Sequence, residues 1–346
     1  MKILIAGSGK MGTDIFYYLL DFSLSIVWLC LDESEKQKAE SGFRKKTDRQ
    51  LRAGLLSEKE YHELIGRVLI TCETGAAADC ALVIEAIWED EEAKLRLFRQ
   101  LDEILSPEAI ITTNTSSIPV KRLIPSNNRK PFFCGLHFFF PVKLRNIIEI
   151  NTIPDNDAKT LLCINDFLVA VDRRSILLPE GNHFLLNRLL LPLQNEAYSI
   201  LQEGLLTAPE IDALVKTKIF PGGIFEFFDH VGIDIMRVSV KNYAENFPSD
   251  TDYSGLIACF DTMVSEGRSG VKSGQGFYQY PNMQKIGDFK TEKHPGAIKR
   301  LHMVFFETLQ KALRYDIVRK NELEYAVNEY LGTDIIQTGK DAGYEF

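Results

Sequence analysis

Two residues in the segment CGLHFFFPVKLRNIIEI (134–150) could take part in proton transfer. His137 lies near the end of one apolar, strand-like run, and Glu149 lies in a second such run after a short polar interruption. A histidine changes its charge near neutral pH, so it can act as a general acid or base. A lone histidine beside three phenylalanines is more often a core residue, and the pair therefore needs support from the rest of the chain.

A glycine-rich turn near the N-terminus could bind a dinucleotide. The apolar run KILIA leads directly into GSGKMG, whose glycines have GxGxxG spacing ahead of a helical stretch. In such a turn the first glycine allows the tight bend, the second lets the backbone approach a pyrophosphate, and the third allows close packing of helix on strand. The phosphate is expected at the helix N-terminus. The predicted cofactor-binding residues of this loop are Gly7, Gly9, Lys10, Met11 and Gly12.

An acidic residue follows the second apolar run at the spacing expected for ribose binding. Asp32 comes after SIVWLCL and twenty residues after Gly12. A carboxylate at this place accepts both ribose hydroxyls of adenosine and would repel the 2′-phosphate of NADP, which favours NAD. The next residues, Glu33 and Ser34, supply no arginine for such a phosphate. The structural alternative for Asp32 is a helix N-cap.

Strand-like and helical stretches alternate along the first half of the chain. Apolar runs at 80–87, 109–113 and 131–139 are separated by segments such as 90–105, in which apolar residues recur at helical spacing. This alternation predicts a parallel, doubly wound sheet with ligands at the carboxyl ends of its strands. Polar residues at such ends are Glu85 with Glu89, the run NTSS at 114–117, and His137.

The composition is that of a globular protein large enough for two domains. The chain has 346 residues, of which 45% are hydrophobic and 25% are charged. The formal net charge of −8 argues against a nucleic-acid partner. The six cysteines have no metal-ligand spacing and suit a reducing compartment, so we expect no metal site. The first residues fit neither a signal peptide nor a membrane anchor, and we expect a cytoplasmic protein without membrane contact.

A basic segment interrupts the predicted sheet. Residues 33–66 exceed what a minimal nucleotide-binding unit needs, and GFRKKTDRQLRAG within them carries most of the local positive charge. One interpretation is a solvated helix face, and the other is a binding site for an anionic, phosphate-bearing substrate tail. The residues predicted for this binding site are Arg44, Lys45 and Arg49, and the same run contains Lys46 and Arg52.

Six sequence motifs, two of them described above, together indicate a family resemblance. GSGKMG, LVIEAIWED, TTNTSSI, CGLHFFFP with IIEI, FLLNRLLLPLQNEA and GVKSGQGFYQY resemble, in this order, motifs of the (3S)-3-hydroxyacyl-CoA dehydrogenase family. The resemblance covers about residues 1–285. It implies NAD-dependent oxidation of an acyl-CoA substrate, from the (3S)-3-hydroxyacyl-CoA to the 3-oxoacyl-CoA, and the reverse reaction. It also implies a Rossmann-type, doubly wound α/β domain followed by an all-α domain that is 6-phosphogluconate-dehydrogenase-like.

The resemblance implies roles for individual residues as well. In that family the motif histidine is the general base and a glutamate twelve residues later orients it, which assigns these roles to His137 and Glu149. Ser116 and Asn187 match residues that hydrogen-bond the substrate oxygen; their structural alternatives are an ST-turn and a contact at a helix N-terminus. The positions expected to reach the cofactor are Glu89, Lys94 and Asn114, and a solvated helix face is the alternative for the first two.

The sequence departs from the family pattern at four positions. Phe140 stands where the motif HFFNP has asparagine, and a phenyl ring cannot form the hydrogen bonds of an amide. Asp14 and Phe16 stand where the first helix favours small residues, and Asp14 adds negative charge near a bound pyrophosphate. Ile224 replaces a proline in a turn. The change at Phe140 leaves two alternatives: a catalytically impaired NAD-binding protein, or a dehydrogenase of a free hydroxy or diketo acid.

The second half of the chain is predicted to be helical. Stretches at 183–203, 207–217 and 224–246 have helical start signals or amphipathic spacing. His183 and His230 in this half have no carboxylate at a recognisable spacing, which marks both as structural residues.

A weak internal repeat extends beyond the family's short form. Residues 187–215 resemble residues 299–327 at an offset of 112. This predicts a degenerate second copy of the helical module, as in multifunctional members of the family. Short-form members bury an apolar helical face by dimerising, so a second copy that covers this face predicts a monomer, or a homodimer through another surface. The predicted domains are 1–180 (NAD-binding), 181–285 (helical) and 286–346 (second copy).

Overall fold

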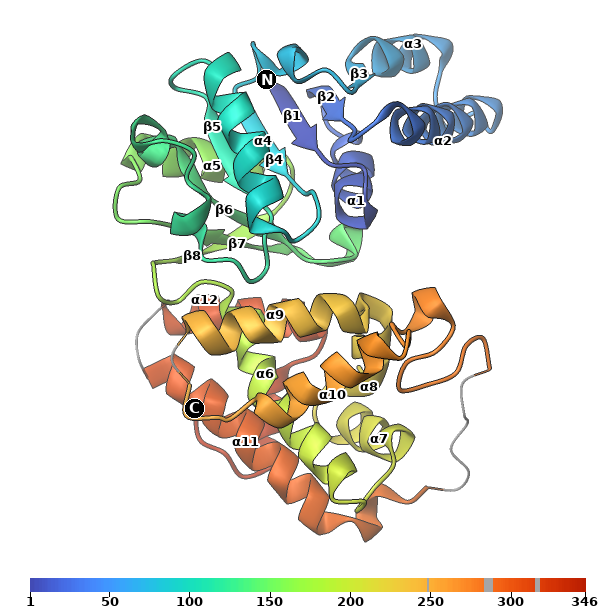
Figure 1. Cartoon of the computed structure of the whole chain (residues 1–346), viewed down its shortest axis with the longest axis vertical. Helices are drawn as coiled ribbons and strands as arrows, with labels where there is room; N and C mark the ends of the chain where they lie inside the picture. Colours follow the sequence, from blue (N-terminus) through green and yellow to red (C-terminus); the bar gives the residue numbers. More distant parts are fainter. Residues whose placement is uncertain (248, 283–288, 315–317) are drawn as a thin grey trace. The chain divides into compact units, whose positions relative to one another are not determined.

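The computed structural model describes residues 1–247, 249–282, 289–314 and 318–346. The chain divides into two compact units, Met1–His183 and Phe184–Phe346 (Figure 1). The first unit combines a sheet with helices, and the described part of the second is helical, which confirms the predicted fold class. Within the described ranges no helix is long and apolar enough to cross a membrane.

An eight-stranded sheet forms the centre of the first unit. Its strand order is β3-β2-β1-β4-β5-β6-β7-β8, and all neighbours are parallel except the antiparallel pair β6 and β7. The order reverses between β1 and β4, which is the switch point where a Rossmann-type sheet binds its ligand. The strands are β1 (Lys2–Ala6), β2 (Ser25–Leu29), β3 (Val68–Thr71), β4 (Leu82–Glu85), β5 (Ile110–Thr113), β6 (Phe133–Phe138), β7 (Ile147–Asn151) and β8 (Arg174–Leu178).

Helices cover both faces of this sheet (Figure 1). Phe16 of α1 and Phe167 of α5 share one apolar core with Cys134 of β6. Neighbouring residues of a strand face opposite sides, and Phe133 meets Phe98 of α4 edge-on on the other face, with ring centroids 5.1 Å apart. The helices of this unit are α1 (Lys10–Leu19), α2 (Glu33–Arg52), α3 (Glu58–Gly66), α4 (Glu91–Ile104) and α5 (Ala158–Ala170).

Aromatic packing accounts for the phenylalanine in the first helix. Phe16 stacks on Trp28 of β2 with ring centroids 4.0 Å apart, and it meets Phe43 of α2 edge-on at 5.7 Å. The Trp28 indole donates a hydrogen bond of 2.8 Å to the carbonyl of Gly7. A small residue at position 16 would leave a cavity beside the ring that holds the glycine turn.

The second unit is built from helices in its described ranges. The predicted stretch 224–246 is two helices, because Gly232 adopts a φ of +107° and separates them. Ile224 is the first residue of α8, a position that also tolerates proline, so this departure from the family affects little. The helices are α6 (Leu185–Gln202), α7 (Ala208–Lys218), α8 (Ile224–Val231), α9 (Ile233–Asn246), α10 (Ser254–Ser265), α11 (Pro295–Arg314), α12 (Lys320–Leu331) and α13 (Ile335–Asp341).

Helix bounds repeat along this unit at the offset seen in the sequence. A shift of 112 residues moves α7 to 320–330, where α12 lies, and moves α6 to 297–314, a range that belongs to α11. α11 packs along α6, and Arg300 of α11 donates hydrogen bonds of 2.7 and 2.8 Å to the two carboxylate oxygens of Glu203. The domain division at residue 286 and the expected monomer or alternative homodimer stay predictions.

The motif GVKSGQGFYQY closes around a buried carboxylate. The backbone N–H groups of Phe277 and Tyr278 donate to Asp229, each at 2.9 Å, and the Tyr280 hydroxyl donates to it at 3.1 Å. Burial raises the pKa of Asp229, although these hydrogen bonds oppose the rise. A Cβ at Gly276 would lie 1.9 Å from Asp229 Oδ1, so this motif needs glycine for structural reasons.

The variant Gly276→Ala is expected to lower the free energy of unfolding by about 2–4 kcal/mol, because its methyl group displaces the Asp229 carboxylate from its donors. Urea unfolding followed by circular dichroism measures this loss. The control is Gly255→Ala, where the added Cβ would meet its nearest neighbour at an ordinary 3.6 Å. A Gly276→Ala protein that unfolds at the wild-type urea concentration would contradict the expectation.

Candidate active site

The hairpin of β6 and β7 brings His137 and Glu149 face to face. The two residues pair directly across the strands, and His137 Nδ1 lies 2.7 Å from Glu149 Oε2. His137 is 4% exposed and Glu149 is 0% exposed. A buried carboxylate at this distance orients the ring, stabilises an imidazolium and turns Nε2 away from itself. The twelve-residue spacing thus follows from the hairpin register.

Asn114 joins the ends of three neighbouring strands. Its N–H donates to the carbonyl of Glu85 at the end of β4, at 2.8 Å. Its side-chain Oδ1 accepts the N–H of Phe138 in β6, also at 2.8 Å. Because Phe138 follows His137, Asn114 anchors the strand that carries the histidine. The expected cofactor contact of Asn114 stays a prediction.

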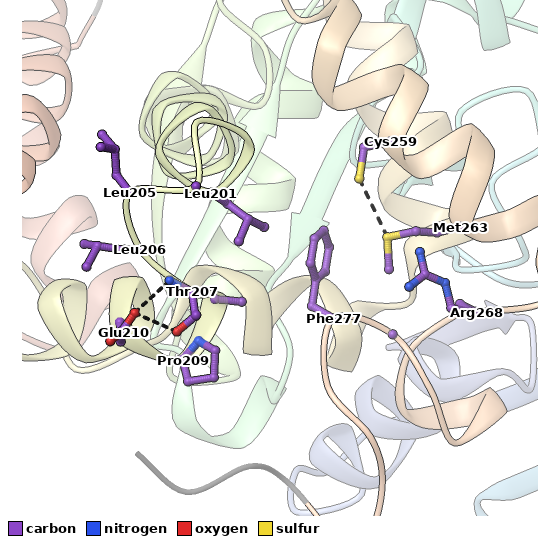
Figure 2. A pocket seen from close by; sticks show the side chains of 13 residues that line it. Leu201, Leu205, Leu206, Thr207, Pro209, Glu210, Cys259, Met263, Arg268 and Phe277 are labelled. Carbon is purple, nitrogen blue, oxygen red and sulfur yellow. Dashed lines mark hydrogen bonds between the residues drawn. The ribbon is translucent and has the colours of Figure 1, made fainter. Parts of the chain in front are cut away.

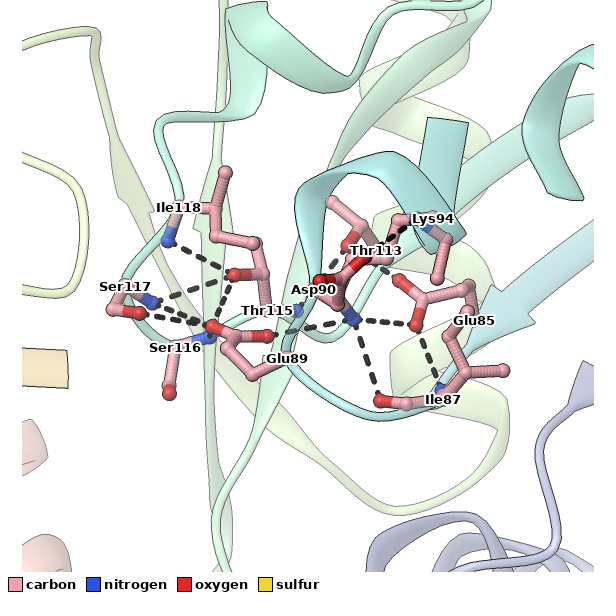
Figure 3. Close-up of polar contacts among 11 residues, drawn as sticks. Glu85, Ile87, Glu89, Asp90, Lys94, Thr113, Thr115, Ser116, Ser117 and Ile118 are labelled. Atoms are coloured by element: carbon pink, nitrogen blue, oxygen red, sulfur yellow. Dashed lines mark hydrogen bonds and ion pairs between the residues drawn. The ribbon is translucent and has the colours of Figure 1, made fainter. Parts of the chain in front are cut away.

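The carboxylate of Glu89 holds the turn that contains Ser116. Its Oε1 accepts hydrogen bonds from the hydroxyls of Thr115 and Ser117, at 2.5 and 3.0 Å (Figure 3). The same oxygen accepts the N–H groups of Ser116 and Ser117, at 3.0 and 3.1 Å. In Figure 3 the side chain of Ser116 points away from Glu89. The backbone of Ser116 is therefore fixed while its hydroxyl extends in another direction.

A buried lysine neutralises charge behind this turn. Lys94, in the first turn of α4, is 1% exposed, and its Nζ lies 2.5 Å from Glu85 Oε1 and 3.4 Å from Glu89 Oε2 (Figure 3). The remaining oxygen of Glu85 accepts the hydroxyl of Thr113 at 2.6 Å. Neither Thr113 nor Thr115 was predicted as a site residue from the sequence, although both belong to the motif TTNTSSI.

The charges of this cluster stabilise one another. Burial by itself lowers the pKa of Lys94, but the attraction of Glu85 and Glu89 outweighs it and leaves the pKa above its ordinary value. Burial likewise raises the pKa of Glu89, but Lys94 and the hydrogen bonds of residues 115–117 bring it below the ordinary value. The alternative of a solvated helix face is wrong for Lys94, which is buried. It is wrong for Glu89 too, because Glu89 precedes α4 and its side chain is only 17% exposed. Their contact with the cofactor stays a prediction.

The glycine loop has the geometry that a pyrophosphate needs. Gly7 adopts a φ of +118°, and a Cβ on it would lie 2.5 Å from the carbonyl oxygen of Ala86. A Cβ on Gly12 would lie 2.1 Å from the Gly7 carbonyl oxygen, so helix and strand are in close contact. Apart from Gly9 and its two chain neighbours, no described residue has an atom within 4 Å of a Cβ placed on Gly9, the N-cap of α1. The first residues of α1 are Lys10 and Met11. The loop thus offers space beside Gly9 and helix N–H groups for an anion.

Asp32 is the N-cap of α2. Its Oδ1 accepts the N–H of Glu35 at 2.8 Å, and the residue is exposed. The N-cap interpretation is therefore correct. An exposed carboxylate at the end of β2 is also compatible with a second acceptor role, and ribose binding by Asp32 stays a prediction.

Two contacts connect α1 to the segment that follows His137. Asp14 Oδ2 accepts the N–H of Val142 at 2.6 Å, so a backbone donor stabilises the negative charge of this carboxylate. Lys10 Nζ lies 4.1 Å from the centroid of the Phe140 ring, within range of a cation–π interaction. Asp14 and Phe140, two of the residues that depart from the family pattern, thus both form contacts between α1 and the segment after His137.

The basic segment lies on α2. Arg44, Lys45 and Arg49 are exposed, and their side-chain cations form no hydrogen bond or ion pair with another described residue. Lys46 differs, because its Nζ lies 4.0 Å from the centroid of the Tyr17 ring and burial lowers its pKa. The three exposed cations are available to a ligand, which fits either interpretation of the segment.

Asn187 belongs to the second unit, in the first turn of α6. Its Nδ2 donates to the hydroxyl of Tyr243 at 3.2 Å, and its Oδ1 accepts the hydroxyl of Tyr330 at 2.8 Å. Neither tyrosine was predicted from the sequence. They lie 56 and 143 residues further along the chain, so no local spacing could have indicated them.

An open pocket in the second unit contains none of the predicted site residues. It has a volume of about 490 Å³ and is lined by residues such as Leu201, Met263 and Phe277 (Figure 2). Its polar groups serve local structure, since Thr207 and Glu210 form the capping box of α7. No cluster of three metal-ligating side chains occurs among the residues that the structure describes.

Both units match one enzyme family. Residues 2–181 match the NAD-binding domain of 3-hydroxyacyl-CoA dehydrogenase, and residues 184–280 match its C-terminal domain. The chain therefore belongs to the 3-hydroxyacyl-CoA dehydrogenase family. It is an NAD-dependent oxidoreductase, and the glycine loop described above fits this cofactor.

Individual relatives agree with this assignment. The chain is 29% identical over 281 residues to the probable 3-hydroxybutyryl-CoA dehydrogenase of Deinococcus radiodurans, which covers 81% of this chain and 100% of that protein. The crystal structure of (S)-3-hydroxybutyryl-CoA dehydrogenase PaaH1 from Ralstonia eutropha matches with a TM-score of 0.71 at 27% identity, covering 81% of this chain and 99% of that one. The dehydrogenase part of multifunctional enzyme 1 from C. elegans shares the fold, with a TM-score of 0.57 at 20% identity, covering 96% and 78%.

The variant Lys94→Met is expected to lower the free energy of unfolding by about 3–5 kcal/mol, because it leaves the Glu85 carboxylate buried without its cation. Chemical denaturation of the purified variant measures this. The double variant Glu85→Gln, Lys94→Met removes both charges and should recover part of the loss. Lys59→Met, at a side chain that is 84% exposed, is the matched control. A Lys94→Met protein as stable as the control would refute the structural role.

Proposed function

We propose that this protein oxidises the 3-hydroxyl group of a (3S)-3-hydroxyacyl-CoA to the 3-oxoacyl-CoA with NAD, and that it catalyses the reverse reaction. The observation that carries this proposal is the buried pair of His137 and Glu149, with 2.7 Å between Nδ1 and Oε2. The two relatives described as 3-hydroxybutyryl-CoA dehydrogenases support the choice of substrate class.

The chain's own residues manage the proton. His137 Nε2 accepts the proton of the substrate 3-hydroxyl while C3 loses a hydride. NAD, when bound, would supply the hydride acceptor in its nicotinamide ring. Glu149 keeps the proton on Nδ1 and stabilises the imidazolium. In the reverse direction the imidazolium returns its proton to the oxygen, so one proton and one hydride are transferred each way.

Two further side chains are proposed as donors to the substrate oxygen, the Ser116 hydroxyl and the Asn187 amide. Donors aimed at an oxygen that gains negative charge stabilise the transition state. The fixed backbone of Ser116 and the direction of its side chain support the first assignment. The match of FLLNRLL to the family motif supports the second.

The cofactor is proposed to lie along the carboxyl ends of the strands. The pyrophosphate binds the loop formed by Gly7, Gly9, Lys10, Met11 and Gly12. Asp32 accepts the adenosine ribose hydroxyls, and Glu89, Lys94 and Asn114 belong to the cofactor-binding residues as well. The open space at Gly9 and the exposure of Asp32 support this placement.

Consumption of NADH with acetoacetyl-CoA tests the proposed function directly, with free acetoacetate and NADPH run beside it. Turnover with the thioester and NADH supports the proposal. Turnover with acetoacetate instead supports a dehydrogenase of a free acid. NADH binding without any turnover supports a catalytically impaired protein, in which Phe140 has cost the site its amide.

The variant His137→Ala is expected to reduce kcat with acetoacetyl-CoA about 10²- to 10⁴-fold, because the reaction loses its general acid or base. The dissociation constant for NADH should change little. His230→Ala is the control, since His230 is exposed and its ring bonds the carbonyl of Glu226 within its own helix. A His137→Ala enzyme within a few-fold of the wild-type rate would rule out the proposed base.

The triple variant Arg44→Ala, Lys45→Ala, Arg49→Ala is expected to raise KM for acetoacetyl-CoA about tenfold at low salt with kcat unchanged, because each lost cation weakens phosphate binding. Steady-state kinetics at two salt concentrations measure the effect, which should shrink at high salt. Lys38→Ala, at another exposed lysine of α2, is the control. An unchanged KM would favour the interpretation of a solvated helix face.

A further inference from the structure

A hydrogen bond joins the glycine loop to the helix that follows β2. Ser8 lies between the first two glycines of this loop, and its hydroxyl donates to a carboxylate oxygen of Glu35 in the first turn of α2. The N–H of Glu35 in turn donates to Oδ1 of Asp32, the N-cap of the same helix, at 2.8 Å. The Glu35 carboxylate is therefore held against the loop, and its backbone is held by the residue that caps the helix.

No neighbouring cation balances the charge of Glu35, unlike that of Glu33 in the same helical turn. Glu33 pairs with Lys36, whose Nζ lies 3.0 Å from Oε1. No lysine or arginine among the described residues forms an ion pair with Glu35. Its charge affects the end of β2, where burial raises the pKa of the Cys30 thiol to about 11. Glu35 adds to this rise, and a hydrogen bond with Ser8 opposes it.

The adenosine ribose is expected between the two elements that this hydrogen bond joins. In a Rossmann-type domain the pyrophosphate lies on the glycine loop, and the acidic residue after the second strand accepts the ribose hydroxyls. The ribose of the proposed placement therefore extends from the loop to Asp32, beside the bond between Ser8 and Glu35. NADP differs from NAD by a phosphate on the 2′-oxygen of this ribose, and such a phosphate carries about two negative charges near neutral pH.

We propose that Glu35, held against the glycine loop by Ser8, is a specificity-determining residue that selects NAD over NADP. The N-terminus of a helix would otherwise suit a phosphate. In α2, however, Asp32 already takes the N–H of Glu35, and the unbalanced Glu35 carboxylate repels a second anion. Asp32 and Glu35 thus both act against a 2′-phosphate, from the two ends of one hydrogen-bonded unit. The inference rests on the proposed function, in which the ribose lies at Asp32.

The test compares NADH with NADPH binding, followed by the nicotinamide fluorescence of each cofactor. The variant Glu35→Gln removes the charge, and its side-chain oxygen can still accept the Ser8 hydroxyl. We expect the ratio of dissociation constants, NADPH over NADH, to fall about tenfold at low salt and less at high salt, where the repulsion is screened. Glu40→Gln, which removes a carboxylate further along α2, is the control and should keep the wild-type ratio. Equal ratios in the two variants would overturn the inference.

Two further variants separate the charge, the hydrogen bond and the placement of the cofactor. Ser8→Ala keeps the charge but releases it from the loop, so its ratio should fall, though less than in Glu35→Gln. A wild-type ratio in Ser8→Ala would overturn the role given to Ser8. Asp32→Asn can still cap α2 and should weaken NADH binding about tenfold, because the ribose loses a charged acceptor.

Binding is the readout in every variant, so no outcome depends on turnover of the thioester. An unchanged NADH dissociation constant in Asp32→Asn would overturn the proposed placement of the ribose and this inference together. Weaker NADH binding in Asp32→Asn, combined with a wild-type ratio in Glu35→Gln, would overturn the inference alone.

Discussion

The antiparallel pairing of β6 with β7 is the constraint on which the chemistry of the first unit depends. In an antiparallel pair, residues stand directly opposite one another, and a short connection suffices to bring them together. Glu149 can therefore lie directly opposite His137 although the two residues are only twelve positions apart in the sequence. The 2.7 Å contact between them orients the imidazole ring. A parallel partner strand would need a long crossover, and its residues would come from a distant part of the sequence.

Two glutamate carboxylates hold the neighbouring residues in place along the same edge of the sheet. Glu85 ends β4 and takes donors from Lys94 and Thr113, while Glu89 takes donors from the turn at 115–117. A buried charge that loses its partners is costly, so the groups around it cannot move independently. The ends of β4, β5 and β6 consequently form one rigid rim, and both His137 and Ser116 belong to it.

The sequence allowed good predictions wherever a function depends on local spacing. The glycine loop, the cap at Asp32 and the helices around 185–202 and 320–331 follow from neighbouring residues and from a repeat that can be aligned. Contacts between distant segments were not predictable, because they depend on the tertiary arrangement. Asp14 and Val142 are 128 residues apart, and Tyr330 and Asn187 are 143 apart.

Lys94 illustrates a second kind of limit. The helix α4 begins with acidic residues, and a lysine close to them in sequence is compatible with an ordinary solvent-exposed helix face. Lys94 differs from such a lysine because it packs against the end of β4, where its ammonium pairs with the buried carboxylate of Glu85. The sequence motif LVIEAIWED contains that glutamate, yet the pairing becomes evident only once β4 and α4 are placed.

The contact between Lys10 and Phe140 has an evolutionary consequence. The ammonium of Lys10 lies 4.1 Å from the ring centroid, and Lys10 is the first residue of the helix that begins beside Gly9. An asparagine at position 140 has no π face, so it changes the electrostatic environment of a charge at the phosphate-binding loop. The two positions are therefore epistatic: the fitness effect of a substitution at 140 depends on the residue at 10, and lineages that exchange one should exchange the other.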